Sequence, residues 1–133
     1  MKKSALLVVC VLGAAVGAAL AQQSAPTENK GMSAQQMSGF ELSKQGLKDY
    51  EQRQMRIRHI KLDPGGVAAL HSHAQRPALS YIISGTILEH RKGGPDRTYK
   101  AGEVITESTD VEHWAENTGS EPVVIVSVDL FKE

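Results

Sequence analysis

Residues 65–73 read Gly-Gly-Val-Ala-Ala-Leu-His-Ser-His, and this stretch decides the fold. A glycine pair opens a short apolar run that ends on two histidines separated by one residue. In a β-strand the side chains of residues i and i+2 lie on the same face, so His71 and His73 can offer two imidazoles to one point. A third histidine, His113, follows a second strand-like stretch. The pattern predicts strands that bring three histidines together.

Short apolar segments separated by turn residues continue on both sides of this stretch. Runs of roughly 4–8 residues at a spacing of about 8–12 residues are typical of an all-β sandwich or barrel. No helical stripe follows residue 50, and no internal repeat is present. We therefore predict a single antiparallel β-barrel of the jelly-roll class. Its expected strands are residues 53–62, 67–73, 79–84, 86–91, 97–100, 103–107, 112–117 and 122–130.

Composition excludes several classes of function. The 133 residues include 15 basic and 15 acidic side chains, interspersed without a basic stripe. This balance disfavours binding to nucleic acid or to anionic membranes. The single cysteine, Cys10, excludes an intrachain disulfide and a cysteine zinc site. No Ser-His-Asp, phosphate-loop or H-E-x-x-H pattern is present, which removes most hydrolase and nucleotide-binding functions.

The first residues have the layout of a secretory signal peptide. Two lysines precede an apolar run, and the sequence Ala-Leu-Ala at 19–21 matches a cleavage site before Gln22. A retained anchor and a lipoprotein with lipidated Cys10 are the less favoured alternatives. We expect residues 1–21 to be removed from an exported protein, periplasmic or extracellular, with no stable membrane insertion afterwards.

The remaining chain divides into an arm and a domain. Residues 22–39 are polar and without periodicity, which predicts a tether or a flexible lead-in. Residues 40–49 suit either a short helix or an arm packed on the domain. We therefore expect a flexible arm over residues 22–50 and a barrel domain over residues 51–133.

Two segments of this domain resemble the two motifs of the cupin family. The first motif has the form G-x5-H-x-H-x(3–4)-E-x6-G, and the second has the form G-x5-P-x-G-x2-H-x3-N. The matching residues are Gly65, His71, His73 and Gly85 in the first motif and Gly102, His113 and Asn117 in the second. The resemblance covers residues 55–130. It implies a small antiparallel β-barrel with a divalent metal held by the histidines, and a homodimer.

The chain departs from this pattern at the metal site. Ala78 stands where the family's glutamate belongs, and Ser108 and Asp110 replace the proline and glycine of the second motif. Glu107 lies two residues after Ile105, so both side chains are expected to face the interior. A carboxylate there is costly unless it is paired or binds metal. Three alternatives follow: a site of three histidines, a site completed by Glu107, and an empty polar pocket.

The available donor atoms limit which metal can bind, and polar residues near the histidines in sequence are candidate substrate contacts. Imidazoles suit iron, nickel, copper or zinc, and manganese is retained as a further candidate. Gln75 and Arg76 follow the first two histidines, and Arg76 can bind a substrate carboxylate through its planar fork, the alternative being an exposed loop arginine. Ser80 is in phase with the pocket and can add a polar contact. We expect a small-molecule ligand to bind through these three residues.

Other conspicuous side chains are assigned structural roles. We predict core packing for Tyr81, and packing on the outer face or in a dimer contact for Trp114. Asn117 is expected to fix a strand end or turn. His59 and His90 lack motif support and are expected to be surface or hydrogen-bonded strand histidines.

These features favour an exported metal-binding cupin that acts on a small organic molecule as an oxygenase. The alternatives are a non-catalytic module that binds metal or a small ligand, and a metal-independent isomerase or cyclase with a histidine base.

Overall fold

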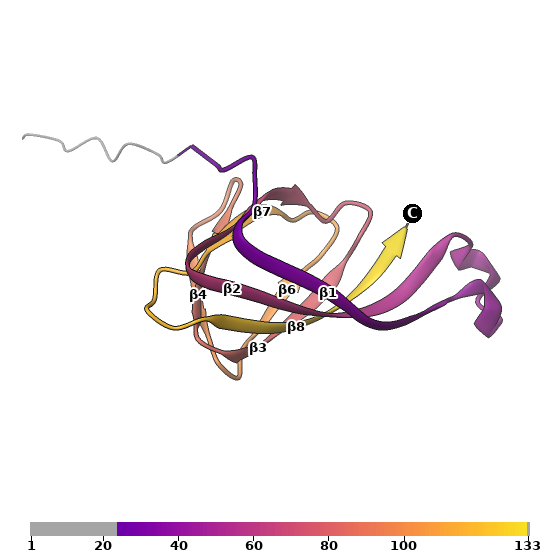
Figure 1. Cartoon of the computed structure of the whole chain (residues 1–133). Helices are drawn as coiled ribbons and strands as arrows, with labels where there is room; N and C mark the ends of the chain where they lie inside the picture. The colour runs from indigo at the N-terminus through magenta and orange to yellow at the C-terminus, as the bar shows by residue number, and fades with distance from the viewer. Residues whose placement is uncertain (1–23, 133) are drawn as a thin grey trace, which may run out of the picture.

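The computed structural model describes residues 24–132 as an all-β domain (Figure 1). Two short 3-10 helices, Ser43–Gln45 and Lys48–Tyr50, connect the first two strands. The predicted signal peptide, residues 1–21, lies outside the described residues. Among the residues described, no helix is long and apolar enough to cross a membrane. The strands are β1 Lys30–Glu41, β2 Arg53–Ser72, β3 Ala78–Ser84, β4 Thr86–Arg91, β5 Arg97–Lys100, β6 Val104–Glu107, β7 Glu112–Glu116 and β8 Val123–Lys132.

The strands form one antiparallel sheet that curls into a nearly closed barrel. Its order is β5-β4-β7-β2-β8-β3-β6, with β1 added on β2. The hairpin of β1 and the first half of β2 extends beyond the barrel, with the two 3-10 helices at its tip (Figure 1). The prediction of a single antiparallel β-barrel is confirmed, and the six strands from β3 to β8 begin and end within two residues of their expected bounds.

Strand β2 corrects one of the predicted boundaries. Residues 63–66 were expected to form a turn between two strands, but β2 runs through them as one strand of 20 residues. Lys30 pairs with Val67 and Met32 with Leu62, so residues 63–66 bulge opposite Gly31 alone. On either side of this bulge β2 changes partner, from β8 to β7. The turn-forming residues therefore bend the strand around the barrel and do not reverse it.

Strand β1 corrects the prediction of a flexible arm over residues 22–50. Lys30–Glu41 pairs with β2 in antiparallel register, although nearly all of its residues are exposed. A strand held mainly by backbone hydrogen bonds needs no apolar alternation, so the absence of a hydrophobic pattern hid it. The chain before β1 is also attached, because the Leu70 amide donates to the Pro26 carbonyl at 2.9 Å.

The hydrophobic core fills one part of the barrel interior. Its buried members are Ile60, Leu62, Ala68, Ile82, Ile87, Ile105, Ala115, Val123 and Ile125. The prediction of core packing for Tyr81 is wrong, because its side chain is 45% exposed between Leu79 and Ile83. These residues alternate with the buried positions of β3 and point outward, and in the described part of the chain no second layer covers them.

Gly85 provides a test of this packing. Its φ is +82°, and a Cβ atom there would lie 2.9 Å from both the Pro122 carbonyl oxygen and the Val123 Cα. Gly93 has a similar φ of +75° but no atom within 4 Å of such a Cβ. The left-handed backbone costs an alanine about 1–2 kcal/mol, and overpacking adds about 1–3 kcal/mol.

We expect Gly85→Ala to lower the free energy of unfolding by about 2–5 kcal/mol, and Gly93→Ala by only the backbone share of about 1–2 kcal/mol. Urea denaturation of both variants measures the difference. Equal losses would show that the close approach to β8 does not constrain this turn.

Candidate metal centre

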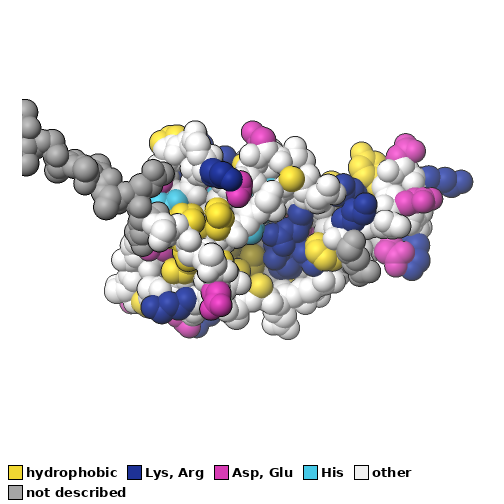
Figure 2. All heavy atoms as spheres, turned by 90° about the horizontal axis from the view of Figure 1, so that it is seen from above, with side chains coloured by type: hydrophobic (Ala, Val, Ile, Leu, Met, Phe, Trp, Pro, Cys, Tyr) yellow, Lys and Arg dark blue, Asp and Glu magenta, His cyan; other side chains and the backbone are white. Residues whose placement is uncertain are grey.

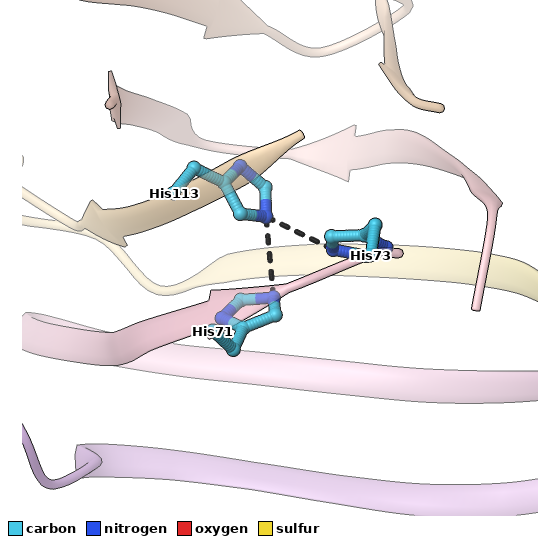
Figure 3. Close-up of side chains that lie close together, drawn as sticks. All are labelled: His71, His73 and His113. Atoms are coloured by element: carbon cyan, nitrogen blue, oxygen red, sulfur yellow. Dashed lines mark hydrogen bonds between the residues drawn. The ribbon is translucent and has the colours of Figure 1, made fainter. Parts of the chain in front are cut away.

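Three histidines from two strand ends meet inside the barrel (Figure 3). His71 lies near the end of β2 and is paired in register with His113 on β7. His73 follows β2, and its amide donates to the Val111 carbonyl at 2.8 Å, which continues the strand geometry past Ser72. Nε2 of His113 lies 3.1 Å from Nε2 of both His71 and His73. The geometry predicted from alternation and motif spacing is present.

The other nitrogen of each ring faces an acceptor. Nδ1 of His71 lies 2.7 Å from the Ala69 carbonyl, Nδ1 of His73 lies 2.8 Å from the Arg76 carbonyl, and Nδ1 of His113 lies 2.5 Å from Glu89 Oε1. Each acceptor is satisfied by a proton on Nδ1, which leaves the three Nε2 atoms directed toward one another. Each of the two 3.1 Å contacts between Nε2 atoms, drawn as dashed lines in Figure 3, can share at most one proton. A cation between them fits this arrangement, and neutral imidazole is a transition-metal ligand.

Burial keeps these rings in the form that binds metal. Burial lowers the pKa of His71 below its ordinary value, and it lowers the pKa of His73 to about 4. Both rings are therefore neutral near pH 7, with the Nε2 atoms free of protons. No proton would have to be displaced from these two rings for a metal to bind.

Glu89 on β4 is a site residue that the sequence reasoning missed. Its side chain is fully buried, and its carboxylate accepts from His113 Nδ1 and from Arg91 Nε at 2.9 Å. Burial alone would raise the pKa of Glu89, but the hydrogen bonds from His113 and Arg91 outweigh it and lower the pKa. A carboxylate that orients a ligand histidine from behind raises its basicity. The available signal was that Glu89 is in phase with Ile87, two residues before it, so both side chains take the same face of β4.

Glu107 reaches the histidines from the neighbouring strand β6. It is paired in register with Ala78, the position at which the family's glutamate is missing, and paired residues point to the same face. Its carboxylate oxygens lie 3.7 Å from His113 Nε2 and 3.9 Å from His73 Nε2. Burial raises the pKa of Glu107, although the nearby His113 opposes this. Glu107 therefore brings a carboxylate to the place that Ala78 leaves without one.

The histidines open into a cavity of about 400 Å³. Ser80 lines it and donates from Oγ to Glu107 Oε2 at 3.0 Å. Arg76 also lines it, whereas Gln75 is exposed and only its backbone carbonyl is engaged, by Arg53 at 2.8 Å. Apolar walls come from β2, β4, β6 and β8, and residues of β1 form part of the rim. A volume of this size is typical of a small-molecule site.

A basic cluster around Asp129 was not predicted. Asp129 is 1% exposed and binds Arg56 through both oxygens, from Nε and from Nη2, at 2.9 Å each. Arg58 Nη2 lies 3.1 Å and Arg76 Nε 3.8 Å from Asp129 Oδ2. The Arg58 Nε atom is buried without a hydrogen-bond partner among the described residues, a condition that costs about 1–3 kcal/mol. Asp129 sits in phase with Ser127 and Ile125 on β8, which was the signal available in the sequence.

Three of the structural roles predicted from sequence are confirmed. Trp114 packs outside the cavity, where the His90 ring stacks on it at a centroid distance of 3.7 Å. His90 is a hydrogen-bonded strand histidine, with Asp96 at 2.9 Å and Glu116 at 3.1 Å. Asn117 fixes the end of β7, because its amide donates to the Leu62 and Glu121 carbonyls and accepts from the Gly119 amide.

Comparison with known proteins identifies the same fold. A predicted oxalate decarboxylase from Thermotoga maritima is 23% identical, with a TM-score of 0.59 over 80% of this chain and 93% of that one. The cupin domain of an XRE family transcriptional regulator from Enterobacter cloacae is 18% identical, with a TM-score of 0.58 over 78% and 100%. KdgF from Halomonas sp. is 14% identical, with a TM-score of 0.59 over 80% and 88%.

These likenesses show the fold alone, since the structures belong to proteins of varied function. No curated protein matches the sequence. The sequence profile of the cupin domain matches residues 58–129, which is more than half of the chain and includes the three histidines, Glu89 and Glu107. This chain therefore belongs to the cupin family.

Proposed function

We propose that this cupin holds one divalent transition metal on His71, His73 and His113 and acts on a small organic molecule as a metal-dependent oxygenase. The observation that carries the proposal is the convergence of three Nε2 lone pairs on rings whose Nδ1 protons are bound elsewhere. Imidazole donors suit iron, nickel, copper and zinc, and a carboxylate from Glu107 would extend the range to manganese.

The cavity walls and polar side chains define what the chain itself contributes. A metal held by His71, His73 and His113 would supply Lewis-acid and redox chemistry beside the cavity. Glu89 holds the tautomer of His113, and Ser80 orients the Glu107 carboxylate. Ile87, Ile105 and the other apolar lining residues exclude water from the space beside the histidines. A small substrate is thereby confined next to the open face of the site.

Metal analysis and oxygen uptake test this function. We expect protein purified without chelator to contain about one iron per chain and to consume oxygen with a member of a panel of diketones, thiols and phenolic acids. Stoichiometric zinc or copper without oxygen uptake would replace the oxygenase by a metal-binding module. Protein that takes up no metal under any loading condition would leave the metal-independent isomerase or cyclase.

The Glu107→Gln variant distinguishes a site of three histidines from one completed by Glu107. If Glu107 is a ligand, its loss should lower metal occupancy by about tenfold or more, in the range of 10- to 100-fold typical of damage around a metal. Elemental analysis of the purified variant measures this, with Glu103→Gln, on the exposed turn before β6, as the control. Unchanged metal content in Glu107→Gln would establish the three-histidine version.

A further inference from the structure

The cavity has a second polar end, opposite in charge to the carboxylate of Glu107. Asp129 is one buried carboxylate facing three guanidinium groups. Arg56 occupies both of its oxygens, and its guanidinium carbon also lies 3.6 Å from the centre of the Phe131 ring. Arg58 and Arg76 are left with donors that Asp129 cannot satisfy. The cluster therefore carries an excess of positive charge on these two residues.

Arg58 and Arg76 are the two members of this cluster that line the cavity, together with the three histidines. Their side chains are only 14% and 26% exposed, so water satisfies few of their donors. Arg58 Nε is the clearest case, because it is buried and has no hydrogen-bond partner in the described part of the chain. Figure 2 shows basic side chains gathered at the centre of one face beside hydrophobic ones. A guanidinium with unused donors can form charge-assisted hydrogen bonds with an anion.

We propose that Arg58 and Arg76 bind a carboxylate of the substrate, so that the cavity takes a small organic acid with its charged end on the arginines and its reacting end toward the histidines. This inference rests on the proposed function for the reacting end only. A planar guanidinium fork matches a carboxylate through two parallel hydrogen bonds. Glu107, the acidic residue that lines the same cavity, is bound by Ser80 beside the histidines and does not neutralise the arginines by contact.

Charge around Arg58 agrees with this role. Burial lowers the pKa of Arg58 and Asp129 opposes this, while the neighbouring Arg76 and Arg56 lower the pKa further and Glu107 opposes them. An anion bound at the cavity side of the two guanidinium groups would relieve the repulsion between the arginines. Inorganic phosphate shares part of this chemistry, so the test has to separate a carboxylate from a phosphate.

Arginine Nε–H signals of metal-free protein, recorded by ¹⁵N-resolved NMR at pH 7.5 and constant ionic strength, provide the measurement. The Arg58 signal is identified by its loss in Arg58→Gln. We expect it to shift saturably on addition of acetate and to be unaffected by acetamide, which has the same shape without the charge. In Arg76→Gln, the acetate concentration for half saturation should rise at least tenfold. The exposed Arg97→Gln variant on β5 should leave it unchanged.

Using metal-free protein separates this inference from the proposed function, because failure of metal binding would not alter the acetate response. An Arg58 signal that ignores acetate, or that responds equally to acetamide, would overturn the anion site. A response to inorganic phosphate at lower concentration than to acetate would overturn the carboxylate assignment. Through-bond correlations can also assign the Arg58 signal in the wild-type protein itself, so the inference stays falsifiable even if Arg58→Gln or Arg76→Gln fails to fold.

Discussion

The His113→Gln variant is expected to hold less than about a tenth of the metal bound by the wild-type protein. His113 Nε2 lies 3.1 Å from the Nε2 atoms of both other histidines, so it joins His71 and His73 into one site. Without it, the two remaining imidazoles lack their common partner. Disturbing only the groups behind a ligand weakens metal binding by about 10- to 100-fold, and removal of the ligand should cost at least as much. Elemental analysis after loading with Zn²⁺ measures the effect.

Two further variants make this result specific. His59→Gln removes a half-buried strand histidine outside the triad and should retain full occupancy. His71→Gln repeats the ligand loss at a residue whose Nδ1 binds only a backbone carbonyl, so it leaves no buried carboxylate without its partner. Wild-type occupancy in both His113→Gln and His71→Gln would refute the three-histidine site.

The Glu89→Gln variant is expected to bind Zn²⁺ about 10- to 100-fold more weakly than wild type. Glu89 accepts the Nδ1 proton of His113 and so holds Nε2 ready as the ligand atom. A neutral amide removes the negative charge behind the ring, and it can also turn its NH₂ group toward Nδ1, which favours the wrong tautomer. The carboxylate is fully buried, so solvent does not replace it.

Competition with a chromophoric chelator measures the Zn²⁺ affinity, and circular dichroism verifies the fold of each variant. Glu112→Gln is the matched control, because Glu112 pairs with Lys92 at 2.7 Å on the exposed side of the structure. Its affinity should equal that of wild type. A Glu89→Gln affinity within twofold of wild type would show that Glu89 only fills space behind His113.

The strand pattern after residue 50 was sufficient to predict the barrel, because alternation and turn residues are local signals. It was insufficient for β1, because the polar and exposed residues of this strand show no alternation of apolar and polar side chains. It also misplaced the turn at residues 63–66, because proline and glycine mark a bulge as well as a reversal. Whether such residues reverse a strand or bend it depends on the partners that the strand finds on either side.

The residues of the candidate site likewise fall into those that the sequence predicted and those that it missed. Histidine spacing was enough to place His71, His73 and His113 together, since strand alternation and motif distances agree. Glu89, Arg58 and Asp129 were missed, because each looks like an ordinary charged residue in its own strand. Their roles arise from contacts between distant positions of the chain. Glu89 and His113 are 24 positions apart, Arg58 and Asp129 are 71 apart, and Arg56 and Asp129 are 73 apart.

Sequence alone determined that this chain is an all-β barrel of the cupin type with three histidines directed to one point. Only the tertiary structure decided what surrounds that point. The register of β3 against β6 places Glu107 opposite Ala78, and the pairing of β2 with β8 brings Arg56 and Arg58 to Asp129. The physical reason is that periodicity along a strand sets which face a side chain takes, whereas the pairing of distant strands sets which side chains it meets there.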